Sequence, residues 1–190
     1  MSSENMLIAR VCHDLITPFN AINLGLEAFE MSSDMSLIEN IKESTSKANA
    51  ILKFTRELFS VKADTFCYSI NSLKQLISDV LKYNNITFFL ESDIDTIPNV
   101  AGKIIMYTAT VAKEIMPFGG VVTTRLNDLS GEIITRCGGK NVSLPSVTFN
   151  GEVTHRNIIR HCLLEQLAQS GFELKTRQEG MDVIITEKMI

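Results

Sequence analysis

The sequence lacks the paired cysteines that mark the common zinc and dithiol redox sites. Its four cysteines lie far apart and form no Cys-x-x-Cys pair, so neither kind of site is expected from them. Isolated cysteines are typical of buried free thiols in a reducing compartment. They are Cys12, Cys67, Cys137 and Cys162. We therefore expect a cytoplasmic protein with free thiols.

Long apolar runs and an excess of basic charge are also missing. The most apolar stretch, 101–122, is interrupted by two lysines, a glutamate and a proline, which argues against a transmembrane helix. Residues 1–10 lack the basic start and apolar run of a signal peptide. With 18 Lys and Arg against 22 Asp and Glu, the formal charge is −4, which is not the basic footprint of a nucleic-acid binder. We expect a soluble chain that binds neither membrane nor nucleic acid.

What the sequence does contain, at its start, is a pair of amphipathic helices. Apolar residues recur at heptad-like spacing in 8–29, and 37–59 carries a second helical face. The seam of the first helix consists of Ile8, Val11, Leu15, Ile22, Leu26 and Phe29. Only the short segment 31–35 separates the two helices, so they are predicted to be antiparallel neighbours.

Downstream of these helices the pattern becomes a mixture of helices and strands. Helices are predicted over 71–83, 102–116 and 151–170, and strands over 86–91, 121–126, 132–136, 172–177 and 181–186. Residues 61–69 are predicted as a linker and Pro98 as a turn. The last four strands form two hairpins, and the helices cover one face of a mixed sheet. The predicted fold class is α+β, with a helical hairpin over 1–62 and an α/β domain over 63–190.

A two-helix hairpin cannot bury its apolar residues alone. The simplest covering surface is a second copy of the chain, which gives a four-helix bundle with two-fold symmetry. A homodimer is therefore expected. The alternative is that the hairpin folds back on its own α/β domain, and the sequence leaves that alternative open.

The most distinctive local motif is segment 10–18, Arg-Val-Cys-His-Asp-Leu-Ile-Thr-Pro. With the seam facing inward, His13 points about 180–200° away from its centre and into solvent. A neutral imidazole is a competent nucleophile near neutral pH. Because adjacent helical residues do not face each other squarely, Asp14 would assist through a partner or through water. Arg10, one turn earlier, would steady a phosphoryl group by charge-assisted hydrogen bonds.

Residues 10–27, RVCHDLITPFNAINLGLE, resemble the histidine box of dimeric two-component proteins. They are most similar to the ChpT-type histidine phosphotransferases of alphaproteobacteria. The similarity continues in 112–120, AKEIMPFGG, which resembles the family's A-x-E-x-x-P-x-G-G. The resemblance implies a helical hairpin that dimerises into a four-helix bundle, followed by an α/β sandwich resembling a degenerate histidine kinase ATP-binding domain.

The same resemblance implies the roles of the residues in the histidine box. His13 would accept and donate the phosphoryl group, with Asp14 as its catalytic neighbour. The supporting or docking residues would be Arg10, Ile16, Thr17 and Asn20. The apolar side chain at position 16 suits a hydrophobic contact with a receiver domain.

Sensor histidine kinases share this box, so the nucleotide site separates a kinase from a carrier. Alignment on Pro117 and the glycine pair puts Tyr107 and Val111 where kinases carry metal-binding asparagines. Neither side chain can hold Mg²⁺, which requires hard oxygen ligands. No Asp-x-Gly-x-Gly motif follows. We therefore expect no cofactor on this chain, with Mg²⁺ supplied by the partner receiver domain.

The expected reaction is a relay between receiver domains, one in a hybrid histidine kinase and others in response regulators. His13 would take the phosphoryl group from one receiver aspartate and pass it to another. Two alternatives stay open: a histidine kinase with residual ATP-dependent activity, and a non-catalytic dimeric adaptor that binds receivers. No metal site is expected, since His155 and His161 lie about 240° apart on one predicted helix.

Overall fold

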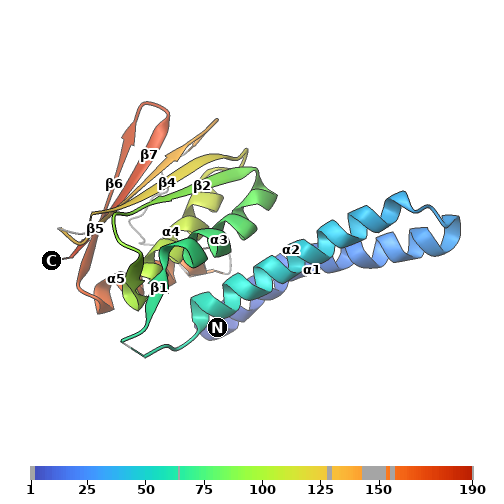
Figure 1. Cartoon of the computed structure of the whole chain (residues 1–190), viewed down its shortest axis with the longest axis horizontal. Helices are drawn as coiled ribbons and strands as arrows, with labels where there is room; N and C mark the ends of the chain where they lie inside the picture. The colour runs from blue at the N-terminus through green and yellow to red at the C-terminus, as the bar shows by residue number, and fades with distance from the viewer. Residues whose placement is uncertain (1–2, 64, 128–129, 143–152, 155–156, 190) are drawn as a thin grey trace.

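The structure, a computed structural model, describes residues 3–63, 65–127, 130–142, 153–154 and 157–189. It begins with two long helices, α1 (Ser3–Ser32) and α2 (Ser36–Phe59), which pack side by side as the predicted hairpin. The end of the hairpin that carries the N-terminus lies against the rest of the molecule, and the far end projects away from it (Figure 1). The hairpin is therefore supported by the remainder of the chain at one end only.

Local hydrogen bonds define the turn between the two helices. Ser33 has a positive φ of 53°, and its N–H donates to the Phe29 carbonyl at 2.7 Å, which closes α1. The Asp34 carboxylate accepts a hydrogen bond at 2.9 Å from the N–H of Ser36, where α2 begins. A turn this short keeps the two helices antiparallel.

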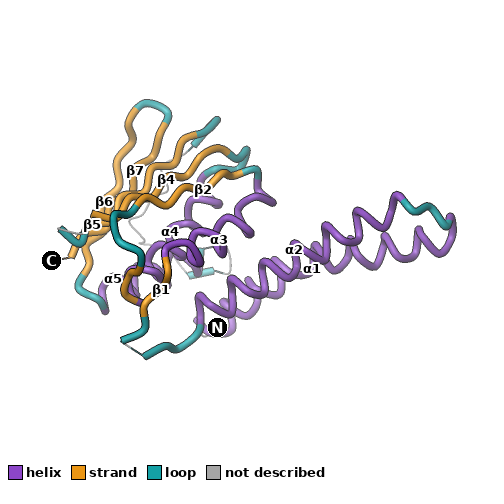
Figure 2. Tube along the Cα trace, in the orientation of Figure 1, coloured by secondary structure: helices purple, strands orange, loops and turns teal. Residues whose placement is uncertain are grey.

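The α/β part is a five-stranded mixed sheet with helices on one face (Figure 2). Its helices are α3 (Ile70–Leu81), α4 (Asn99–Ile115) and α5 (Ile158–Gln169), and a 3-10 turn spans Lys82–Asn84. The strands lie in the order β2 (Ile86–Glu91), β4 (Gly120–Asn127), β5 (Glu132–Gly138), β7 (Asp182–Met189), β6 (Phe172–Glu179). β2 and β4 are parallel, and the other neighbours are antiparallel. This arrangement confirms the predicted α+β fold class and both predicted hairpins.

Two elements differ from the sequence-based prediction. The predicted linker contains a short strand, β1 (Cys67–Ser69), which pairs with β3 (Thr96–Pro98). Pro98 therefore ends a strand directly before α4 instead of forming an isolated turn. The pairing is held by Tyr68 and Ile97, which are register partners and are both buried.

The last helix also begins later than predicted. Val153 and Thr154 are not helical, and α5 starts only at Ile158. The side-chain oxygen of Asn157 accepts a hydrogen bond from the Thr154 N–H at 2.7 Å, which fixes a turn before the helix. The remaining predicted positions before this turn lie outside the described residues.

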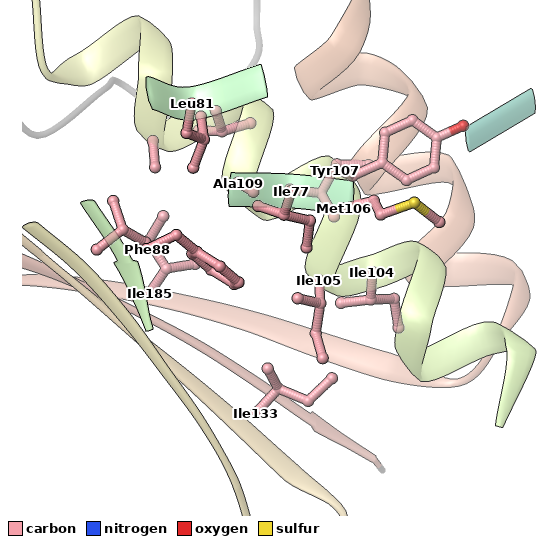
Figure 3. Packing of buried hydrophobic residues seen from close by; sticks show 14 of the residues in the cluster. Ile77, Leu81, Phe88, Ile104, Ile105, Met106, Tyr107, Ala109, Ile133 and Ile185 are labelled. Atoms are coloured by element: carbon pink, nitrogen blue, oxygen red, sulfur yellow. The ribbon is translucent and has the colours of Figure 1, made fainter. Parts of the chain in front are cut away.

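The core lies between α4 and the sheet. Ile104 and Ile105 on α4 are completely buried and point toward the sheet, where Ile133 lies (Figure 3). Buried polar pairs are enclosed in the same layer: the Thr108 hydroxyl donates to a carboxylate oxygen of Glu187 on β7 at 2.5 Å, and the hydroxyls of Thr124 and Thr135 lie 3.0 Å apart. Burial of this apolar layer supplies the main driving force for folding of the α/β part.

The base of the hairpin shares this core. Phe54 and Leu58 on α2 are buried within the same apolar cluster as α3 and α4. The base of the hairpin therefore packs on the chain's own α/β part, as in the predicted alternative to a dimer. The far end of the hairpin does not pack on the α/β part (Figure 1). None of the helices in the described ranges combines the length and apolar character that crossing a bilayer requires.

Candidate functional site

His13 lies on α1 at the level where the hairpin meets the α/β part. Its side chain is 72% exposed, which confirms the predicted direction into solvent. It borders a polar crevice of about 140 Å³. The crevice is lined by His13, Asp14, Thr17, Lys47, Ile51, Val80, Tyr83, Asn84 and Lys113. Both helices of the hairpin, the end of α3 with its 3-10 turn, and α4 thus meet beside the histidine.

Asp14 contacts the His13 ring directly. Its Oδ1 lies 3.3 Å from His13 Nδ1. The prediction that Asp14 acts only through a partner or through water is therefore wrong. Nδ1 is the ring nitrogen nearer the backbone, so the short side chain of the adjacent Asp14 reaches it directly. A carboxylate at Nδ1 favours the tautomer with the proton on that nitrogen. In that tautomer the lone pair of the neutral ring is on Nε2.

Two cations hold the second oxygen of Asp14. Oδ2 lies 3.4 Å from Arg10 Nε and 3.7 Å from Lys113 Nζ. Partial burial favours a higher pKa for Asp14, but Lys113 and Arg10, with the hydrogen bond from His13, outweigh it, so the pKa lies below its usual value. Asp14 is therefore ionised at neutral pH and accepts the proton of Nδ1–H.

Further ion pairs extend this arrangement into the α/β part. Glu114 on α4 is only 10% exposed, and it lies 3.7 Å from an Arg10 nitrogen and 2.9 Å from Arg160 Nε on α5. Burial raises the pKa of Glu114 even though Arg160 and Arg10 act to lower it. These pairs connect α1 with α4 and α5 at the height of His13.

The other residues predicted from the histidine box fall into two groups. Ile16 is 56% exposed, and Thr17 and Asn20 are also exposed, as expected for a docking surface. Arg10 is only 15% exposed and its guanidinium faces Asp14 and Glu114. That position suits holding Asp14, and its contact with a phosphoryl group stays a prediction.

Sequence reasoning missed the contribution of Lys113 to this site. The residue lies within the segment AKEIMPFGG that carried the resemblance, yet its pairing with Asp14 joins positions far apart in the chain. In the sequence, the one indication of a role for Lys113 was its position directly before Glu114, the glutamate of the A-x-E motif. Lys47 and Tyr83 were missed for the same reason, since the crevice that they line exists only after the hairpin packs on α3.

The positions aligned with the kinase asparagines are part of the core. Tyr107 and Val111 are 7% and 4% exposed. The Tyr107 ring packs edge-on against Phe59 of α2, with the centroids 6.4 Å apart. Within the described residues no cluster of His, Cys, Asp and Glu could hold a metal ion. His161 instead lies 3.1 Å from Glu165, and His155 is outside the described residues.

No family model matches the sequence. A curated protein of Brucella abortus (strain 2308), named Protein phosphotransferase ChpT, is 26% identical over 149 residues, which are 74% of this chain and 69% of that protein. The solved structure of a bacterial phosphotransferase matches with a TM-score of 0.86 and 20% identity, over 98% of this chain and 95% of that one. The histidine kinase AdeS of Acinetobacter baumannii matches with a TM-score of 0.51 and 11% identity, over 93% and 96%. The predicted resemblance of this chain to ChpT-type histidine phosphotransferases is thus confirmed in sequence, and its fold is that of a bacterial phosphotransferase.

Proposed function

We propose that this chain is a histidine phosphotransferase that moves a phosphoryl group between receiver-domain aspartates through His13. The observation that carries the proposal is the exposed His13 ring with its Nδ1 at the Asp14 carboxylate. The similarity to a curated phosphotransferase and the matching fold support the same function. Neither a kinase nor a non-catalytic adaptor has better support.

The proposed step is a displacement at phosphorus. The lone pair on Nε2 of neutral His13 attacks the phosphorus of a receiver's aspartyl phosphate, and a P–N bond forms as the P–O bond to the receiver carboxylate breaks. The imidazole ring gains positive charge, which the Asp14 carboxylate stabilises through Nδ1–H. Transfer to a second receiver reverses the step, and a Mg²⁺ ion held by the receiver would supply charge neutralisation for the phosphoryl oxygens.

The surface beside His13 suits an approaching receiver domain. Ile16 is a large apolar residue with 56% of its surface exposed. Thr17 and Asn20 are exposed on the same stretch of α1. Apolar residues ringed by polar ones are typical of the centre of a protein interface. This surface is the proposed docking site.

The residues at the kinase asparagine positions do not fit a nucleotide with Mg²⁺. Buried Tyr107 and Val111 offer no oxygen ligand in a suitable position, and the Tyr107 ring is packed against Phe59. No step of the proposed mechanism therefore involves ATP. In this proposal the α/β part acts as a structural and docking element.

Labelling with two different donors separates the three functions. We expect a phosphorylated receiver domain to transfer label to the wild-type chain, and we expect no label from ATP and Mg²⁺ alone. Labelling by ATP without a receiver would identify a kinase. Receiver binding with no label on the chain, unaffected by His13→Ala, would identify an adaptor. Either result would refute the proposal.

The hairpin also supports a homodimer with a four-helix bundle. Ile8, Phe19 and Leu26 lie within about 20° of one another on α1 and are exposed by 60%, 49% and 45%. Ile8 and Leu26 belong to the seam predicted from the sequence, yet a single chain leaves them exposed, and Leu52 of α2 is 44% exposed as well. A second copy would cover these apolar residues by two-fold symmetry.

A charge placed in this stripe should dissociate the dimer. In Leu26→Glu we expect light scattering at micromolar concentration to give the monomer mass, because a carboxylate would be buried in the bundle. Leu24→Glu is the matched control: it is 66% exposed but lies about 160° around the helix, so the dimer should persist. A monomeric wild type, or a dimeric Leu26→Glu, would contradict this prediction.

A further inference from the structure

We infer that Lys113, on α4 of the α/β part, is a positioning residue for the histidine site on the hairpin. It holds one oxygen of Asp14 so that the other oxygen meets His13 Nδ1. The consequence of this positioning for phosphotransfer rests on the proposed function, in which His13 is the phosphoryl carrier. It gives the α/β part a role at the histidine that requires no nucleotide.

The two oxygens of Asp14 have different partners. Oδ1 lies 3.3 Å from His13 Nδ1, whereas Oδ2 lies 3.7 Å from Lys113 Nζ. A carboxylate that is anchored through one oxygen loses rotamer freedom, so its second oxygen stays directed at the ring. The Lys113 side chain is 22% exposed, so water screens its charge less than it would at an open surface.

The position of Lys113 is fixed by the packing of α4. The neighbouring Ala112 and Ile115 are buried in the core. The next residue, Glu114, pairs with Arg160 on α5 at 2.9 Å. The packing of α4 therefore fixes the point from which the Lys113 side chain reaches Asp14, so the placement of the α/β part sets whether this ion pair can form.

Several other charges face the His13–Asp14 pair. Arg10, on the same helix, shares Oδ2 with Lys113 at 3.4 Å, and Glu114 lies 3.7 Å from Arg10. Lys47 of α2 lines the crevice, but its Nζ lies over the Tyr83 ring, 5.9 Å from the centroid. Among the cations that the structure pairs with Asp14, Lys113 is the one supplied by the α/β part.

The tautomer of His13 tests the inference without any phosphotransfer. Long-range ¹H–¹⁵N NMR correlations on the full chain, assigned with His13→Gln, should show Nδ1–H in the neutral wild-type ring. Lys113→Met should shift the population toward Nε2–H, as Asp14→Ala should, and Lys113→Arg should restore Nδ1–H. An unchanged Nδ1–H population in Lys113→Met would overturn the inference.

A matched variant controls for the loss of positive charge. Lys47→Met removes a cation from the same crevice but leaves the Lys113–Asp14 pair in place, so the tautomer should stay as in the wild type. A tautomer shift in Lys47→Met as large as that in Lys113→Met would overturn the inference. The loss of any positive charge from the crevice would then explain the shift.

Transfer rates separate positioning from direct contact with the phosphoryl group. Lys113→Met should slow transfer from a phosphorylated receiver about tenfold in the wild-type background, and no further in the Asp14→Ala background. Equal losses in both backgrounds would mean that Lys113 acts on the phosphoryl group itself, which would overturn the inference. If His13 takes no label in the wild type while the tautomer responds as described, the proposed function fails and the positioning role stands.

Discussion

Asp14→Ala should slow phosphotransfer from a phosphorylated receiver domain by about a hundredfold, the range typical of a lost acid–base or charge-stabilising group. The variant removes the acceptor that lies 3.3 Å from His13 Nδ1, so the ring loses both its fixed tautomer and the partner for its developing positive charge. Asp14→Asn keeps an oxygen acceptor but has no charge, so its transfer rate should lie between those of Asp14→Ala and the wild type. Rapid-quench labelling measures the rates.

The control for this effect is a carboxylate elsewhere on the hairpin. Glu43 on α2 is exposed, and Glu43→Ala should transfer at the wild-type rate. Thermal unfolding of each variant checks that the hairpin remains folded. If Asp14→Ala transferred as fast as the wild type, the contact between Asp14 and His13 would have no part in the reaction.

The second large effect concerns stability and arises from Glu187. This residue is completely buried, and its second carboxylate oxygen has no hydrogen-bond partner among the described residues. Burial raises the pKa of Glu187 from 4.5 to about 8, although the bond from Thr108 acts against the shift. As pH rises above 4.5, the unfolded chain releases this proton while the folded chain retains it until about pH 8.

The free energy of unfolding should therefore fall between about pH 5 and 8, by about 1.4 kcal/mol per pH unit for one such group. In Glu187→Gln, which has no proton to release, this part of the slope should disappear. Denaturant unfolding at several pH values measures it. Glu173→Gln, at an exposed position on β6, serves as the control and should keep the wild-type slope. A wild-type slope in Glu187→Gln would contradict the prediction.

Features encoded by local periodicity were predictable from the sequence. The hairpin follows from apolar spacing, and the exposure of His13 follows from its angle to that seam. The β-rich composition of segment 86–91, together with the two predicted hairpins, identified the sheet. These signals lie within a few residues of one another and need no knowledge of the tertiary fold.

Features that depend on distant contacts were not predictable in the same way. β1 and β3 contain three residues each, too few to show an alternating pattern, and only the burial of Tyr68 against Ile97 explains them. The pairing of Lys113 with Asp14 likewise requires α4 to pack against α1. The direct contact of Asp14 with His13 depends on side-chain rotamers, which helical spacing does not specify.

The proposed function requires His13 to accept a phosphoryl group and to donate it again without ATP. The most direct measurement is a pulse and chase: the chain is labelled by a phosphorylated receiver domain, purified, and mixed with a second, unphosphorylated receiver in the absence of nucleotide. We predict acid-labile label on the wild type, none on His13→Gln, and transfer of the label to the second receiver's aspartate. Label on His13→Gln, or label that stays on the chain during the chase, would contradict the proposed function.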